Sequence, residues 1–155
     1  MSSVLERFDK IQAVISKQTA DLKESTKIIA VSKTFPIEHI KPLVDRGHVH
    51  FGENKVQEAE KKWATLKNEN RNLKLHMLGK LQTNKAKKAV SIFDYIHSLD
   101  SKKLADILKK SEIEIGKNLS YFIQVNFAQE KQKSGLPVSD VLSFYKYCRN
   151  EIHLN

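Results

Sequence analysis

Cysteine is almost absent from this 155-residue chain, and that scarcity limits the kinds of site it can build. The single cysteine, Cys148, excludes an internal disulfide framework and any metal site made from several thiolates. A lone free thiol is also typical of a reducing compartment. Because nothing near Cys148 in the sequence supplies a base, we expect a packing or surface residue and not a nucleophile.

Long apolar runs are missing as well. No stretch approaches the roughly 18 apolar residues that suggest a membrane span. The first ten residues, MSSVLERFDK, include acidic side chains where a signal peptide has an uninterrupted apolar segment. We therefore expect a cytoplasmic protein with no membrane partner.

Glycine and proline are scarce too, with five and three copies, so no linker or low-complexity segment divides the chain. Residues 1–155 are accordingly expected to form a single domain around one hydrophobic core. The formal net charge is +9, from 27 Lys plus Arg against 18 Asp plus Glu. This excess favours anionic partners without choosing among phosphates, nucleic acid and acidic surfaces.

The first 25 residues show helical periodicity. Apolar side chains recur at steps of three, four or seven, which predicts an amphipathic N-terminal helix packed on another element. These side chains are Leu5, Phe8, Ile11, Ile15 and Leu22.

Residues 26–155 alternate between short apolar strands and helices. In the helix that follows the first predicted strand, Thr34 lies in the capping region, Pro36 marks the start and Gly47 the end. Five consecutive βα units predict an α/β fold with a parallel sheet, either open and doubly wound or part of a TIM-type (β/α) barrel. Both architectures bind ligands beyond the carboxyl ends of the strands. The predicted strands are 27–32, 48–52, 73–78, 95–98 and 119–126, with helices starting near residues 36, 56, 83, 100 and 137.

A lysine, Lys33, follows the first strand. It has two interpretations. In the simpler one, which the spacing favours, its ammonium lies in water at the rim. In the other, it is a desolvated amine with a lowered pKa that forms a Schiff base with an aldehyde.

Polar residues also follow the second strand. Gly52 would allow a backbone or ligand to approach closely, and Glu53 and Asn54 can supply hydrogen bonds there. Asn54 could equally cap the next helix, and both roles are compatible.

The third strand carries His76 and leads through Gly79 into amides and lysines, a combination that suits an anion at a helix N-terminus. The chain has no phosphate-binding glycine motif, which disfavours a nucleotide. His48 and His50, two residues apart, lie on one face of a strand as a metal pair would. Because no further ligand stands at a usual spacing, a zinc site is disfavoured.

Five motifs, taken in order, resemble the YggS-type pyridoxal 5′-phosphate homeostasis proteins, and the resemblance runs from about residue 4 to 145. Any one of these motifs is weak, whereas five in register are specific. They are Ala30-Val-Ser-Lys33-Thr, Phe51-Gly-Glu-Asn54 with Val56-Gln-Glu58, His76-x-x-Gly79-x-Leu-Gln82-x-Asn84-Lys85, His97-Ser-x-Asp100, and Gln124-Val-Asn126 with Lys133-Ser-Gly135.

The resemblance implies a single barrel of the alanine racemase N-terminal type with three cofactor-binding residues. Lys33 would hold pyridoxal 5′-phosphate as a Schiff base, Asn54 would lie near its ring, and His76 matches a family histidine on the third strand. Such proteins carry and buffer vitamin B6 inside the cell without established turnover. Their partners would be the cofactor and the pyridoxal-dependent apoenzymes that receive it.

The length departs from this family. A (β/α)₈ barrel typically needs about 250 residues, and this chain supplies five of eight units. We expect an incomplete barrel that lacks the segments holding the cofactor phosphate and so binds the cofactor weakly. Its open sheet edges would favour self-association or complementation by a second polypeptide.

Two other functions remain open. A basic nucleic-acid-binding module is suggested by Lys80, Lys85, Lys87 and Lys88, but no nucleic-acid motif is present. Many lysines also share helices with carboxylates, as Lys61 and Lys62 do with Glu58 and Glu60, which is typical of a solvated face. A pyridoxal-dependent racemase would need a base opposite Lys33, and the sequence offers none convincingly placed.

Overall fold

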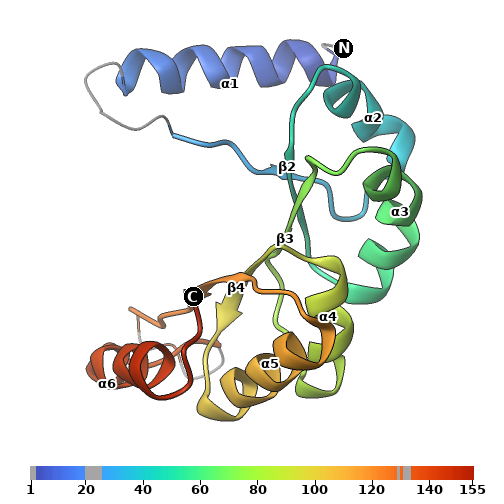
Figure 1. The fold of residues 1–155 in the computed structure, drawn as a ribbon. Helices are drawn as coiled ribbons and strands as arrows, with labels where there is room; N and C mark the ends of the chain where they lie inside the picture. Colours follow the sequence, from blue (N-terminus) through green and yellow to red (C-terminus); the bar gives the residue numbers. More distant parts are fainter. Residues whose placement is uncertain (1–2, 20–25, 129, 131–133) are drawn as a thin grey trace.

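The computed structural model describes residues 3–19, 26–128, 130 and 134–155, in which an N-terminal helix precedes five βα units (Figure 1). The strands are β1 (Ala30–Val31), β2 (His50–Glu53), β3 (Lys74–Met77), β4 (Tyr95–Leu99) and β5 (Ser120–Ile123). The α-helices are α1 (Val4–Gln18), α2 (Ile37–Asp45), α3 (Val56–Glu69), α4 (Ala86–Ile92), α5 (Lys102–Ile115) and α6 (Val141–Lys146). Short 3₁₀ turns at Thr83–Lys85 and Val138–Asp140 precede α4 and α6, and a π-helical turn at Tyr147–Glu151 follows α6.

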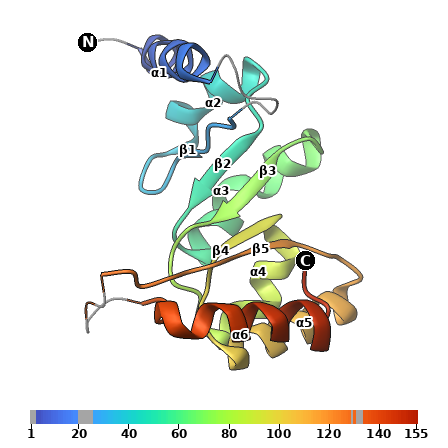
Figure 2. The ribbon, with the colours of Figure 1, turned by 90° about the vertical axis from the view of Figure 1, so that its left-hand side faces the viewer.

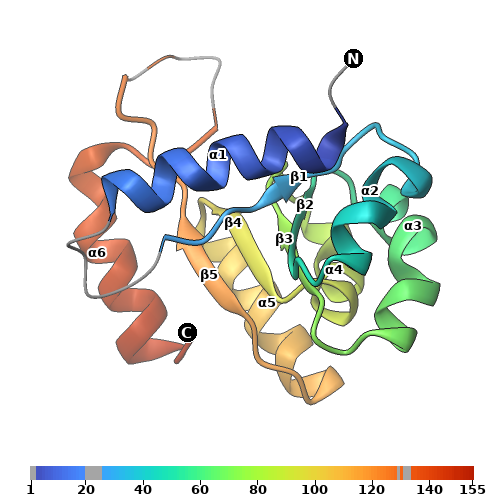
Figure 3. The same ribbon diagram turned by 90° about the horizontal axis from the view of Figure 1, so that it is seen from above.

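The strands form one parallel sheet in the order β1-β2-β3-β4-β5. Seen from above, the sheet curves, with α2 to α5 on its outer side (Figure 3). Seen from the left-hand side of Figure 1, the strands lie in front of α3 and α4 (Figure 2). The predicted α/β fold with five parallel strands is confirmed, and its architecture is a partial barrel.

The two faces of the sheet differ in burial. On the outer face, Phe51, Leu75 and Ile96 are fully buried beneath the helices and form the core with residues such as Trp63. On the inward face, Val31 is 49% exposed and Phe122 is 51% exposed. A closed barrel fills its interior with inward side chains, so these exposed side chains belong to an open structure.

The helix boundaries follow local sequence signals. Ser3 and Glu6 form a capping box at the start of α1, and the Ser101 side chain caps α5. Gly47, with φ of 90°, follows α2 as expected. Leu22 of the predicted N-terminal helix lies outside the described residues.

The predicted capping role of Thr34 is wrong. Pro36 occupies the N-cap position of α2 without a side-chain hydrogen bond, and Thr34 has a φ of 65°. The cause is a turn in which the Phe35 amide donates to the Ser32 carbonyl, so the chain reverses before the helix begins. This turn also ends β1, which is shorter than the predicted strand 27–32.

None of the helices within the described ranges is both long enough and apolar enough to span a lipid bilayer.

Candidate functional site

The strand register aligns the sequence-predicted residues at the carboxyl ends of β1 and β2. Val31 pairs with Gly52, and Gly52 pairs with His76, so these positions share one face of the sheet. Lys33 and Asn54 lie two residues beyond Val31 and Gly52, in the segments that follow β1 and β2. The three predicted site residues therefore come from adjacent segments. His76 is paired with Gly52, two residues before Asn54, and so lies nearer the amino ends of the strands.

Lys33 is exposed at the rim of the sheet. Among the residues that the structure describes, none forms a hydrogen bond or ion pair with its ammonium group. This geometry matches the simpler interpretation, a rim lysine in water. The amine is consequently accessible to an incoming ligand.

The backbone before Lys33 is firmly held. The Ser32 amide donates to the Gly52 carbonyl at 2.9 Å, and the Ser32 hydroxyl donates to Glu53 Oε1 at 2.7 Å. From α3, the Lys62 ammonium donates to the Ser32 carbonyl at 2.7 Å. These contacts fix the end of β1 from the outer side of the sheet.

Glu53 does not take part at the ligand end, contrary to the expectation from its motif. It faces the outer side, is fully buried, and its Oε1 also accepts from Lys62 at 2.8 Å and from Trp63 Nε1 at 3.0 Å. The prediction of a solvated Lys62 is likewise wrong, since its side chain is only 12% exposed. A buried carboxylate requires a compensating charge, and the long lysine stem reaches inward to supply it.

Asn54 is half-buried, and its side chain does not cap the following helix, because Lys55 occupies the N-cap of α3 without a side-chain bond. The loops after β2 and β3 touch here. A Cβ atom added to Gly79 would lie 2.2 Å from the Asn54 carbonyl oxygen. At Gly52, the missing side chain leaves room for Leu78, whose Cδ1 atom lies 2.5 Å from the place that a Cβ atom would occupy.

His76 belongs to a chain of three histidines that the sequence motifs did not reveal. His50 Nδ1 lies 3.0 Å from His76 Nε2, and His76 Nδ1 lies 2.9 Å from His97 Nε2. The signal was available in the sequence, because each histidine lies on the inward side of one of three successive strands. To place these rings together, one must first know which alternate side chains of each strand face inward.

Burial, together with repulsion from His97 and His50, lowers the pKa of His76 to about 3. The pKa values of His50 and His97 are also lowered, chiefly by burial. The three rings are therefore neutral at neutral pH.

His48 does not pair with His50 as a metal ligand. It precedes β2, its Nε2 lies 2.9 Å from the His50 carbonyl oxygen, and its ring packs edge-on against Phe8 and Phe51. Within the described part of the chain, no group of three or more His, Cys, Asp or Glu side chains is arranged to hold a metal ion.

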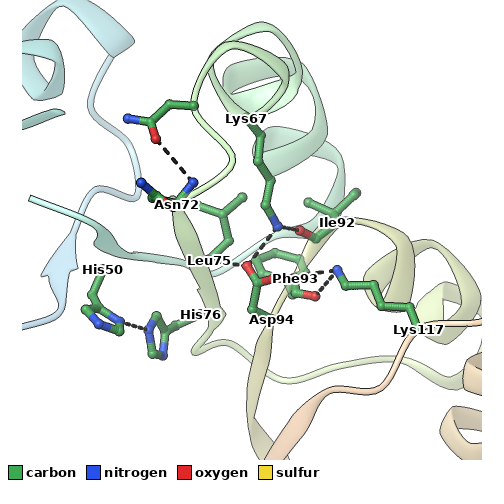
Figure 4. Close-up of polar contacts among 10 residues, drawn as sticks. His50, Lys67, Asn72, Leu75, His76, Ile92, Phe93, Asp94 and Lys117 are labelled. Atoms are coloured by element: carbon green, nitrogen blue, oxygen red, sulfur yellow. Dashed lines mark hydrogen bonds and ion pairs between the residues drawn. The ribbon is translucent and has the colours of Figure 1, made fainter. Parts of the chain in front are cut away.

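A second polar cluster lies at the amino end of β4 (Figure 4). Asp94 Oδ2 accepts from Lys67 at 2.8 Å and from the Leu75 amide at 2.8 Å, and its Oδ1 lies 3.8 Å from Lys117. Burial and the nearby Lys67 lower the pKa of Lys117 to about 8. This cluster is at the opposite end of the sheet from Lys33 and joins α3, β3 and the segment that follows α5.

Cys148 is buried, as expected for a packing thiol. Burial raises its pKa to about 11, so the thiol stays protonated and unreactive at neutral pH.

Comparison with known proteins shows the family to which the chain belongs. The profile of the alanine racemase N-terminal domain matches residues 7–155. The chain belongs to this family. The resemblance to pyridoxal phosphate homeostasis proteins is also confirmed. The chain is 38% identical over 132 residues to the one from Pasteurella multocida and 40% identical over 149 residues to the one from Helicobacter pylori.

A solved structure of this family extends the likeness to three dimensions. PipY from Synechococcus elongatus, with PLP bound, superposes with a TM-score of 0.75 at 37% identity. The match covers 90% of this chain and 64% of PipY. The aligned region covers 85% of this chain and 57% of the Pasteurella protein, and 92% and 66% for the Helicobacter protein. The chain thus spans about 60% of the length of these family members.

Proposed function

We propose that this chain binds pyridoxal 5′-phosphate as a reversible Schiff base on Lys33 and serves vitamin B6 homeostasis without catalytic turnover. The observation that carries the proposal is the exposed ammonium of Lys33 after the carboxyl end of β1, to which the described residues offer no hydrogen bond or ion pair. Asn54 follows the neighbouring strand β2, and His76 lies on β3 of the same sheet. PipY, a relative at 37% identity, supports it because PLP is bound in its structure.

The residues present fit the aldehyde end of this cofactor. An amine without a competing ion pair can attack a carbonyl once it loses its proton, and a Schiff base so formed can be released by water or another amine. Asn54 would lie beside the cofactor ring, where its amide can donate and accept hydrogen bonds. Reversible attachment suits a carrier that passes the cofactor to pyridoxal-dependent apoenzymes.

The described residues include fewer groups suited to binding the phosphate of the cofactor. In barrels of this type, phosphate sites are built by the loops after strands seven and eight, and the described sheet has five strands. The proposal therefore includes a cofactor affinity well below that of a complete relative. It also treats residues 1–155 as one incomplete barrel domain.

The open parts of the sheet support a further element of the proposal, that additional βα units complete the barrel. Val31 and Phe122 are exposed on the inward face, and an apolar cavity of about 670 Å³ lies between α1, β1 and α2. The β1 edge is more open than the β5 edge, where the Tyr121 amide already donates to the Asn155 carbonyl. A second polypeptide resembling the remaining part of the relatives would fit this edge, whereas a second copy would bring five strands where three are wanted.

The basic residues near α4 do not favour nucleic acid as the partner. Lys87 forms an ion pair with Glu114 at 2.8 Å, and Lys88 pairs with Glu60. These contacts neutralise part of the charge that would attract a phosphate backbone.

The deciding experiment is an absorption titration of the chain with pyridoxal 5′-phosphate, followed by borohydride reduction and peptide mass spectrometry. We expect a Schiff-base band and a reduced adduct on Lys33, and loss of both in Lys33→Ala. Lys80→Ala, an exposed lysine after β3, is the matched control and should keep both. An adduct that persists unchanged in Lys33→Ala would overturn the assignment, and turnover of an amino acid would instead favour a racemase.

Light scattering of the purified chain tests the open barrel. Concentration-dependent association that is suppressed by adding a fragment of a relative spanning its last three βα units supports completion of the barrel. A stable monomer that ignores this fragment contradicts it.

A further inference from the structure

The inward face carries an uninterrupted hydrogen-bonded chain of imidazole rings, from His50 on β2 through His76 on β3 to His97 on β4. The two links are 3.0 Å and 2.9 Å between ring nitrogens. Figure 4 shows the first link, between His50 and His76. Three rings joined in this way cross three neighbouring strands diagonally, from the amino end of β2 toward the carboxyl end of β4.

The bonding of His76 forces the chain to have a direction. A neutral imidazole has one N–H donor and one acceptor nitrogen, and His76 uses both of its nitrogens within the chain. It therefore donates to one neighbour and accepts from the other. All N–H groups point toward His97 in one arrangement and toward His50 in the other.

Stacking holds two of the rings in place. The His76 ring stacks on Tyr95, with centroids 4.3 Å apart and an angle of 4° between the planes. The His97 ring stacks on Phe122, with centroids 4.4 Å apart and an angle of 16°. Because these rings cannot turn freely, the chain changes direction most readily by moving protons along it.

The groups around the three histidines favour neutral rings and do not stabilise a protonated ring. The charged or titratable groups that act on His50 are Lys27, His48, Lys74 and Asp94, of which only Asp94 favours protonation. His76 is affected by its two neighbouring histidines and again by Asp94. A proton that enters the chain is therefore passed on and not held.

The two outer nitrogens of the chain open onto different places. His50 lines a cavity of about 280 Å³ between α1 and the segment before β1. His97 lies two residues beyond Tyr95, which pairs with His76, so it lies nearer the carboxyl ends of the strands, where Lys33 follows β1 and Asn54 follows β2. None of the described residues forms a hydrogen bond with His50 Nε2 or His97 Nδ1.

We propose that His50, His76 and His97 form a proton relay between the cavity beside α1 and the cofactor end of the inward face. A proton added at His50 Nε2 displaces the Nδ1 proton to His76 Nε2. The His76 Nδ1 proton then moves to His97 Nε2, and the His97 Nδ1 proton leaves. One proton enters, one leaves, and every ring finishes neutral in its other tautomer; transfer in the reverse direction restores the first arrangement.

This inference rests on the proposed function for its purpose. Condensation of an amine with an aldehyde releases water and its reversal consumes water, so both require proton transfer at the departing or attacking oxygen. A relay that can run in either direction matches reversible attachment at Lys33.

The first test needs no cofactor. Long-range ¹H–¹⁵N spectra of the full chain labelled in histidine report the tautomer and titration of each ring. We expect His76 to remain neutral from pH 8 to 5, and its tautomer ratio to change in His50→Gln and in His97→Gln. His39 is an exposed histidine that does not belong to the row of hydrogen-bonded histidines. The matched control His39→Gln should therefore leave the His76 signals unchanged. A His76 ring that titrates near pH 6.5, or that ignores both substitutions, would overturn the relay.

The second test is kinetic. On mixing with pyridoxal 5′-phosphate, we expect His50→Gln to slow the appearance of the Schiff-base band by at least about tenfold, with the final extent unchanged. The solvent deuterium effect on this rate should fall in His50→Gln and persist in His39→Gln. An unchanged rate and isotope effect in His50→Gln would contradict the relay while Lys33 attachment stands. Absence of any band in the wild type would instead refute the proposed function, and the cofactor-free spectra would still decide whether the histidine chain acts as a unit.

Discussion

The ammonium of Lys62 lies 2.8 Å from the carboxylate of Glu53, and the two side chains are 12% and 0% exposed. Trp63 and Ser32 donate to the same Glu53 oxygen. Removal of one member of a buried pair leaves the other without compensation, a far larger loss than the removal of a surface pair. This relationship joins β1, β2 and α3 directly behind the predicted cofactor lysine.

Glu53→Gln should lower the free energy of unfolding by about 3 kcal/mol, because the ammonium of Lys62 stays buried without a carboxylate. Urea denaturation followed by circular dichroism measures the change. Glu58→Gln is the control, since Glu58 pairs with Lys55 at the surface, and its effect should be much smaller. Equal effects of the two substitutions would contradict this description of the pair.

Gly79→Ala should destabilise the protein more than Gly52→Ala. The new methyl group at position 79 would meet the backbone oxygen of Asn54 at 2.2 Å, whereas at position 52 it would meet the movable end of the Leu78 side chain. We expect a loss of about 2 kcal/mol or more for Gly79→Ala and a smaller loss for Gly52→Ala. Thermal unfolding of both variants checks the order, and a reversed order would show that the loops after β2 and β3 can separate freely.

Asp94→Asn should lower the pKa of Lys117 further below its value of about 8, because the attraction that raises this pKa comes from the Asp94 carboxylate. The titration can be followed by NMR of the Lys117 side chain. The stability should also fall by about 2 kcal/mol, since Lys67 loses its ion pair in a half-buried site. Asp45→Asn, which removes an exposed pair with Lys41, should have little effect on either quantity. A Lys117 pKa that rises in Asp94→Asn would contradict this description of the cluster.

Acidification should destabilise the protein through His76. Its folded pKa of about 3 lies below the ordinary value of 6.5, so between these values the unfolded chain binds a proton that the folded chain does not. The stabilisation is present above about pH 6.5 and is lost as the pH falls toward 3, with a slope of up to about 1.4 kcal/mol per pH unit. Urea titrations at pH 7, 6 and 5 should show a shallower slope in His76→Gln, and an identical slope would assign the acid sensitivity to other groups.

Local pattern was enough to predict the order and type of the elements. The periodicity of Leu5, Phe8 and Ile11 predicted α1, and Gly47 correctly marked the end of α2. Such signals work because caps and side-chain periodicity are set by residues close in sequence. The extents were less accurate, as with β1, because a strand ends where its neighbour stops pairing, and that neighbour is distant in the sequence.

The sequence alone determined that Lys33 follows the first strand, Asn54 follows the second and His76 lies on the third, because the short apolar runs that mark these strands are local features of the chain. Only the tertiary structure decided that Glu53 turns to the outer side to meet Lys62, and that His50 and His97 bond to His76. In each of these contacts, the two side chains belong to different helices or strands. Whether two such side chains meet depends on the register and curvature that the whole sheet adopts, which no single segment encodes.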